Sequence, residues 1–170
     1  MKLQSLFTAL IMLWLNALCL FSTSTHGAQA TVESVVDIQQ LIVREMLPGG
    51  SSTAGYLTLT NHGDSKTQLV SVTSEAFERI EIHEHTMNDG MMKMQQVTKD
   101  IVITPHQSVN FTSGGYHLMM FGPKLKIKKG ITVKVTFNFN NQPSVVADAS
   151  VISVLDQQKQ KQQQNHSHHH

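Results

Sequence analysis

Cysteine is almost absent from this 170-residue sequence, since Cys19 is the only one and lies in an apolar N-terminal stretch. The residues before it, Asn16-Ala17-Leu18, do not resemble a lipoprotein attachment box, so we expect no lipid anchor. The chain beyond residue 30 must therefore fold without disulfides. A core of about 125 residues is long enough to bury a stable interior without them.

Long apolar runs are also missing. The longest covers residues 6–21 and is interrupted by Thr8 and Asn16, whereas a membrane-spanning helix needs roughly 18 or more apolar residues. This run follows Lys2 and precedes the cleavage signal Ala28-Gln29-Ala30. The pattern predicts a cleaved secretory signal peptide over residues 1–30, with a retained anchor as the alternative.

Neither sign of charge is in excess. Removing residues 1–30 takes only Lys2 from the 13 basic residues, which leaves 12 against 12 acidic residues and a formal net charge of zero. No basic field indicates nucleic-acid binding, so we expect no such partner. Four lysines do cluster, and their alternating spacing favours a solvated strand edge or turn over a partner patch: Lys124, Lys126, Lys128 and Lys129.

No helical apolar stripe of useful length follows residue 30. Short β-favouring runs are instead separated by turn residues, and residues 131–138 alternate strictly between apolar and polar. This pattern predicts an all-β domain over residues 31–155, and many short strands favour a β-sandwich. The expected strands are 35–38, 41–45, 54–60, 67–73, 79–87, 91–97, 101–103, 108–111, 116–121, 131–138 and 144–154.

The last segment, residues 156–170, is rich in Gln and ends in His166-Ser167-His168-His169-His170. Its low complexity predicts a disordered tail. Such a His cluster binds copper(II), nickel or zinc weakly. It is either a native metal-collecting tail, which we favour, or a cloning remnant.

Histidine and methionine are what the sequence has in abundance, and they gather between residues 81 and 120. Four of the ten His and six of the nine Met lie there. Imidazole nitrogen with thioether sulfur is a soft ligand set that suits copper(I). Thioethers also form no disulfides in an oxidising exported compartment. A soft-metal site therefore explains the cluster better than core packing, which we expect only of Met46, Met91 and Met120.

Strand geometry predicts which of these side chains meet. Residues i and i+2 of a strand face the same side, so His117 and Met119 form half of a site. The Asp-Gly pair in this stretch favours a two-residue hairpin turn. That turn would set His85 opposite Met94, with His83 one diagonal step away. Periodicity alone leaves the choice between His83 and His85 open.

The same residues resemble the motif of a known family, the periplasmic copper chaperones called PCu(A)C. The motif is His-x10-Met-x21/22-His-x-Met, and here it is complete as His83, Met94, His117 and Met119. The resemblance covers about residues 35–153 and selects His83 over His85. It implies a cupredoxin-like β-sandwich of immunoglobulin-like Greek-key topology. The similar flanking segments are 54–61, 81–84, 90–94, 114–119 and 130–137.

The resemblance also implies a function. Copper(I) would be bound by two His and two Met and delivered towards the Cu(A) centre of cytochrome c oxidase. The partner would be the oxidase subunit that carries Cu(A), or another copper chaperone upstream of it. We expect a periplasmic monomer, with a second copper, as copper(II), on the His-rich tail. His85 and Met92 are candidate neighbours that could catch an ion in transit.

Other functions compete with this interpretation. Four protein ligands leave no open position for a substrate, so we do not expect an enzyme. An electron-transfer cupredoxin is excluded, because its site needs a Cys thiolate that the mature chain lacks. A periplasmic copper storage or resistance protein remains as the alternative. A purely structural sandwich, in which the His and Met are incidental, is the third possibility.

Overall fold

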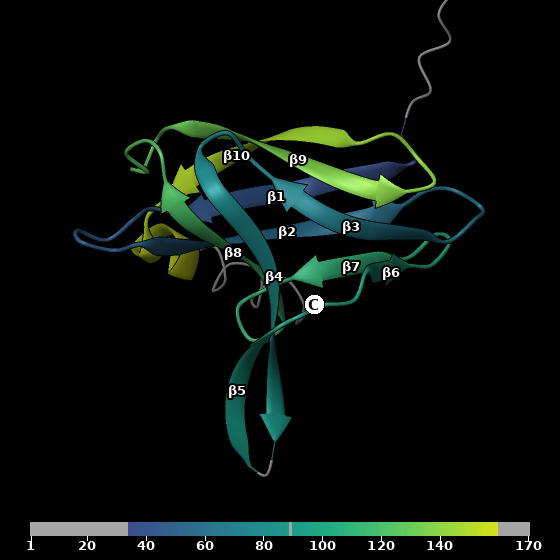
Figure 1. Cartoon of the computed structure of the whole chain (residues 1–170), viewed down its shortest axis with the longest axis horizontal. Coiled ribbons are helices and arrows are strands. Elements are labelled where there is room, and N and C mark those ends of the chain that lie inside the picture. The colour runs from purple at the N-terminus through teal and green to yellow at the C-terminus, as the bar shows by residue number, and fades with distance from the viewer. Residues whose placement is uncertain (1–33, 89, 160–170) are drawn as a thin grey trace, which may run out of the picture. The chain divides into compact units, whose positions relative to one another are not determined.

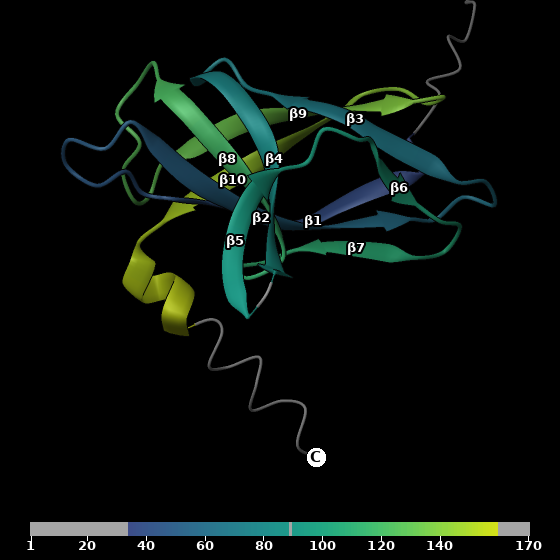
Figure 2. The same ribbon diagram turned by 60° about the horizontal axis from the view of Figure 1, so that its bottom comes forward.

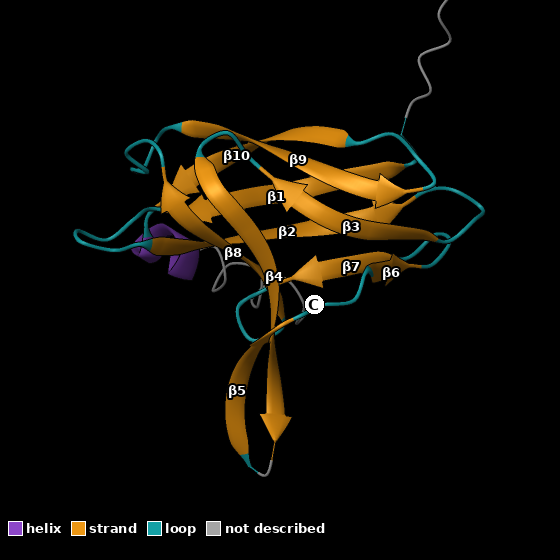
Figure 3. Cartoon of the chain, in the orientation of Figure 1, coloured by secondary structure: helices purple, strands orange, loops and turns teal. Residues whose placement is uncertain are grey.

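The computed structural model describes residues 34–88 and 90–159. The predicted signal peptide, the turn residue Asp89 and the His-rich end of the tail lie outside these ranges. The described chain is built almost entirely of strands, as Figure 3 shows. They are β1 (Val36–Arg44), β2 (Ser52–Asn61), β3 (Thr67–Thr73), β4 (Phe77–Asn88), β5 (Met91–Gln96), β6 (Ile101–Ile103), β7 (Ser108–Phe111), β8 (Tyr116–Pro123), β9 (Thr132–Asn140) and β10 (Val145–Ile152).

All ten strands belong to one hydrogen-bonded sheet, in the order β5-β4-β8-β7-β2-β1-β10-β9-β3-β6, with a further pairing of β8 to β2. Most neighbours are antiparallel, and β1–β10 and β7–β8 are the parallel pairs in the described residues. The sheet folds over so that β9 and β3 lie across the core from β1 and β2 (Figure 1). The all-β prediction is confirmed.

The core forms because alternate residues of each strand face inward. In β9, Val133, Val135 and Phe137 are buried while the residues between them are exposed or half-buried. This matches the alternation in the sequence, and burying one such side chain stabilises the fold by roughly 1.5–3 kcal/mol. The largest fully buried side chains are Phe77, Phe111, Phe137, Leu59, Leu69, Ile103, Leu118, Met120, Ile127, Val43, Val135 and Val151.

The first strand differs from the prediction. The segments expected at 35–38 and 41–45 are one strand, β1, whose register against β2 shifts between Gln39 and Ile42. Gln40 has a φ of 53°. A residue in this left-handed conformation forms a bulge, which interrupts the alternation without ending the strand.

A short helix over residues 154–159 follows β10. The backbone N–H of Asp156 donates to the Ser153 hydroxyl at 3.2 Å, which caps the first turn of the helix. Asp156 also pairs with Lys129 at 2.8 Å, and that hydrogen bond lowers the pKa of the Asp156 carboxyl to about 2. Residues 156–159, predicted to begin a disordered tail, are therefore helical. No helix within the described ranges has the length and apolar character needed to cross a membrane.

The hairpin of β4 and β5 extends beyond the rest of the sheet, as Figures 1 and 2 show from two directions. The inner part of β4 pairs with β8 as far as Glu84. The backbone N–H of His85 still donates to the Gly115 carbonyl oxygen, residues 86–88 pair with β5 alone, and Asn88 lies opposite Met91. The predicted register of a two-residue turn is thereby confirmed.

Candidate metal centre

One face of the β4–β5 hairpin and β8 carries the His and Met side chains of the predicted soft-metal site. Residues directly opposite each other in a sheet share a face. His83 lies opposite His117, and His85 lies opposite Met94. We call this surface the ligand face: Glu81, His83, His85 and Met87 of β4, Met92 and Met94 of β5, and His117 and Met119 of β8.

His117 is at the centre of the ligand face and is only 3% exposed. Its Nδ1 lies 3.0 Å from the carbonyl oxygen of Gly115. A carbonyl only accepts, so the neutral ring donates from Nδ1 and keeps its lone pair on Nε2. Nε2 lies 3.3 Å from Sδ of Met94. Two such ligands of one tetrahedral d10 ion would be about 3.5 Å apart, given typical metal–nitrogen and metal–sulfur bonds.

His83 has the complementary arrangement of its two nitrogens. Its Nε2 donates to Oε2 of Glu81 at 2.8 Å, while its Nδ1 is buried and has no hydrogen-bond partner. A buried polar atom without a partner costs about 1–3 kcal/mol. A carboxylate behind an imidazole is the usual support of a metal-ligating His. The donor set and the free nitrogen therefore fit a metal ion, and the ring lies 6.0 Å from that of His117 between centroids.

Glu81 is itself held in place by Arg79. The guanidinium Nε donates to Oε1 of Glu81 at 2.8 Å, and its carbon lies 4.1 Å from the ring centroid of Phe121. The hydrogen bond from His83, followed by that from Arg79, lowers the pKa of the Glu81 carboxyl. Glu81 is consequently an anion behind His83. No role is predicted for Glu81 or Arg79 from the sequence, although Arg79, Glu81 and His83 follow one another at the i, i+2 spacing of side chains on one strand face.

His85 remains a second candidate ligand. Its ring stacks on that of His117 with centroids 4.9 Å apart and planes inclined by 22°. Its Nδ1, like that of His83, is buried without a partner. The geometry of the described chain therefore keeps both histidines beside His117, and the selection of His83 remains a prediction based on the motif.

The methionines differ in their surroundings. Met94 touches His117 yet is 51% exposed. Met119 is half-buried on the ligand face, opposite Glu81 and one step further along β8 than His117. Met120 is fully buried, as predicted. The expectation that Met91 fills the core is wrong: it is 61% exposed, because the outer part of β5 extends beyond the core.

Charge and ligand type favour a neutral nitrogen and sulfur site. Burial lowers the pKa of His117, so its ring is neutral and its lone pair available at neutral pH. In the described ranges, no three side chains of His, Cys, Asp and Glu are arranged to hold a metal ion. The sulfur of Met94, 3.3 Å from His117 Nε2, is the donor that lies beside the imidazoles.

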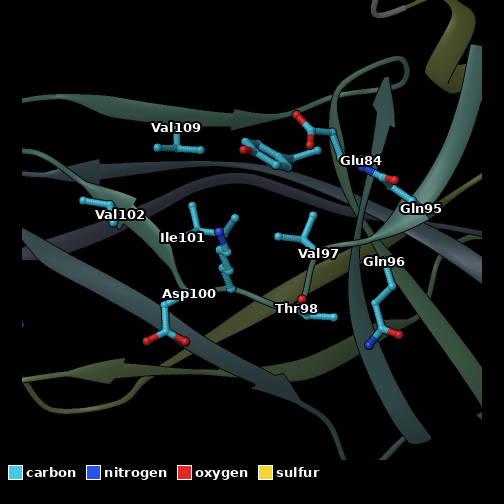
Figure 4. A pocket seen from close by; sticks show the side chains of 11 residues that line it. Glu84, Gln95, Gln96, Val97, Thr98, Asp100, Ile101, Val102 and Val109 are labelled. Atoms are coloured by element: carbon cyan, nitrogen blue, oxygen red, sulfur yellow. The ribbon is translucent and has the colours of Figure 1, made fainter. Parts of the chain in front are cut away.

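A pocket of about 540 Å³ lies on the other side of the hairpin (Figure 4). Glu84 and Gln95, which alternate with residues of the ligand face, line it together with apolar side chains such as Val97 and Ile101. None of the four predicted ligands takes part in it. The pocket is therefore separate from the candidate metal centre.

Comparison with known proteins places the chain in a family. The LpqE-like family model matches residues 36–151, nearly all of the β domain. The chain belongs to the LpqE-like family. That family is described as one of candidate lipoproteins. The prediction that Cys19 carries no lipid stays a prediction, because Cys19 lies outside the described residues.

Two relatives of this LpqE-like chain have been found among curated proteins. The uncharacterized protein RP573 of Rickettsia prowazekii (strain Madrid E) is 31% identical over 128 residues. The match covers 75% of this chain but only 66% of RP573, slightly less than two thirds of its length. Protein Lxx21020 of Leifsonia xyli subsp. xyli, named as a candidate lipoprotein, is 27% identical over 120 residues, or 71% of this chain and 69% of the relative.

Solved structures resemble the LpqE-like domain in fold. The Cu(I) form of DR1885 from Deinococcus radiodurans is 27% identical, with a TM-score of 0.54, covering 76% of this chain and 84% of DR1885. The copper-bound PCuAC domain of PmoF2 is 21% identical, with a TM-score of 0.60 and coverages of 71% and 94%. The chain thus has the fold of PCuAC domains, and the predicted cupredoxin-like sandwich is confirmed.

Proposed function

We propose that this protein is an exported copper(I)-binding chaperone and that its ligand face holds the ion. One observation carries the proposal: the lone pair of His117 Nε2 faces the Met94 sulfur at 3.3 Å, beside a buried and unpartnered nitrogen of His83. Imidazole and thioether together suit copper(I). The copper-loaded forms of DR1885 and of the PmoF2 domain, which share this fold, support the assignment.

The proposed ligands are His83 through Nδ1, His117 through Nε2, and the sulfurs of Met94 and Met119. All four are neutral, so nothing compensates the second charge of copper(II), and copper(I) is favoured. Copper is the cargo of this site. Because four protein ligands leave no open position for a substrate, we propose a binding protein and not an enzyme.

Thioether ligands also suit transfer. Met94 is half exposed, so an incoming ligand of a partner protein can replace it while the remaining ligands still hold the ion. We propose the Cu(A) centre of cytochrome c oxidase as the destination, reached directly or through another chaperone, and the periplasm as the compartment. The implied resemblance to PCu(A)C proteins and the predicted signal peptide support this proposal.

Competition with a coloured copper(I) chelator tests the binding site. In the full-length chain, Met94→Leu and Met119→Leu should each weaken the affinity at least tenfold, or about 1.4 kcal/mol. The matched control is Met91→Leu, because Met91 lies on the same strand with similar exposure but faces away from the ligand face. Since the His-rich tail is present in every variant, a difference in affinity between variants comes from the ligand face. A double Met94→Leu, Met119→Leu variant with wild-type affinity would overturn the assignment.

A second measurement separates the chaperone from a storage protein. Copper-loaded protein is mixed with a copper-free Cu(A) domain of the oxidase, and the purple Cu(A) absorption is followed with an added oxidant. A chaperone should load the domain faster than the same concentration of copper held by a chelator of equal affinity. A rate no faster than that of the chelator would favour storage.

A further inference from the structure

The ligand face does not end at the four proposed ligands but continues outward to the tip of the β4–β5 hairpin. Met87 and Met92 lie directly opposite each other there. They are 68% and 63% exposed. Side chains of directly opposite residues start about 5 Å apart, so both sulfurs can reach one ion.

His85 and Met94 form the next pair inward. Same-face residues along a strand are about 7 Å apart, which is the distance from each pair to the next. His85 therefore stands between the exposed methionine pair and His117, on whose ring it stacks. Its buried Nδ1 has no hydrogen-bond partner, so the structure offers this nitrogen no role in the fold.

We propose that Met87, Met92 and His85 form an outer copper(I) position through which the ion passes between a partner protein and the inner ligands. This proposal rests on the proposed function. One imidazole and two thioethers are again a neutral, soft set that suits copper(I). The position is one pair further out than the site of the motif and is made of residues that the motif does not include.

The burial of His117 explains what such a position contributes. His117 is almost completely covered, whereas Met94 is half exposed, so a partner protein approaches an ion at His117 Nε2 from the hairpin side. The outer part of the hairpin, where residues 86–88 pair with β5 alone, extends away from the sheet (Figures 1 and 2). A partner that docks on the hairpin reaches the methionine pair first.

The transfer needs no redox step. As the ion moves outward, a bond from copper to His85 or Met92 forms while a bond to an inner ligand breaks. The ion remains copper(I) throughout, and the imidazoles remain neutral. Each step exchanges one weak ligand for another, which keeps the barrier low compared with full release into water.

The chain provides a matched control for the pair. Met91 is adjacent to Met92 and is also well exposed, but it pairs with Asn88 on the opposite face of the hairpin. If exposure alone explained copper contacts, Met91 would behave like Met92. The proposal requires that the two behave differently.

The binding test uses full-length protein with 13C-labelled methionine methyl groups, titrated with copper(I) under anaerobic conditions. The first equivalent should shift the methyl signals of Met94 and Met119, and further copper should shift those of Met87 and Met92. The signal of Met91 should stay in place. Shifts of Met87 and Met92 no larger than that of Met91 would overturn the outer position. If Met94 and Met119 themselves do not shift, the proposed function fails instead.

The kinetic test measures transfer to an acceptor of protein size, a copper(I) chelator coupled to dextran. The Met87→Leu, Met92→Leu variant should transfer copper at least tenfold more slowly than the wild-type chain. Met91→Leu should transfer at the wild-type rate. Equal rates for all three proteins would overturn the proposal, and unchanged urea midpoints would show that the exposed substitutions leave the fold intact.

Discussion

The interaction of Glu81 with His83 allows the candidate metal centre to be tested without changing a ligand. The substitution Glu81→Gln keeps the shape of the side chain and an oxygen that can accept from His83 Nε2. It removes the negative charge that lies 2.8 Å from that nitrogen. If His83 binds copper(I) through Nδ1, the loss of this charge makes the ring a weaker donor.

The expected loss of copper(I) affinity follows from the position of Glu81 behind His83. Removing the partner behind a metal-ligating His lowers metal affinity 10- to 100-fold, which corresponds to about 1.4–2.7 kcal/mol. Because the amide oxygen still orients the ring, we expect the lower half of this range, a loss of about 10- to 30-fold. Arg79, which donates to Oε1 of Glu81, would lose both this hydrogen bond and its ion pair, because the one amide oxygen accepts from His83 and the amide NH2 group cannot accept.

The assay is chelator competition for copper(I) at pH 7.5, with Glu84→Gln as the control. Glu84 is on the same strand and has the same charge, but it faces the pocket on the other side of the hairpin. Its substitution should leave the copper(I) affinity within about twofold of the wild-type value, far below the 10-fold loss expected when the partner behind a ligating His is changed. Equal affinities for the two variants would refute the reasoning and would point to His85 as the ligating imidazole.

Two further predictions concern the copper-free fold. Burial lowers the pKa of His117 below its value in the unfolded chain, which is about 6.5. Below about pH 6.5 the unfolded chain therefore binds more protons at this residue than the folded chain does. The free energy of unfolding should be at its full value above about pH 6.5 and decrease as the pH falls. Urea midpoints at pH 7.5 and 5.5 should therefore differ less for His117→Gln than for the wild-type chain, and equal differences would contradict this. Gly122→Ala should cost roughly 1–2 kcal/mol because Gly122 has a φ of +60° and an added Cβ would also meet Glu78. Gly115→Ala, which has no positive φ, should cost less in the same urea experiment.

Most of the strands could be located from local patterns. The strand at Thr67–Thr73 agrees with its predicted range, because a period of two and the flanking turn residues are both local properties. Where a local conformation breaks the period, the prediction fails, as with Gln40 in β1. The helix after β10 was missed although Ser153 and Asp156 have the spacing of a helix cap.

The candidate site could be predicted only in part. Strand parity gave the shared face of His117 and Met119, and the hairpin turn gave the pairing of His85 with Met94, because both depend on neighbours in the sequence. The pairing of His83 with His117 joins β4 to β8, which are far apart in the chain. The same register brings the partly buried Ile80 and Ile82 and the buried Leu118 to the core side of the sheet, and no local pattern contains it.

The sequence by itself determined the chemistry of this protein: a cluster of imidazoles and thioethers, no cysteine beyond Cys19, and a β scaffold. The tertiary structure decided how that chemistry is distributed. It buried His117, put an anion behind His83 and left Met87, Met91 and Met92 exposed at a projecting hairpin. The physical reason is that ligand type and strand parity are local, whereas burial and the register between distant strands depend on how the whole sheet closes over its core.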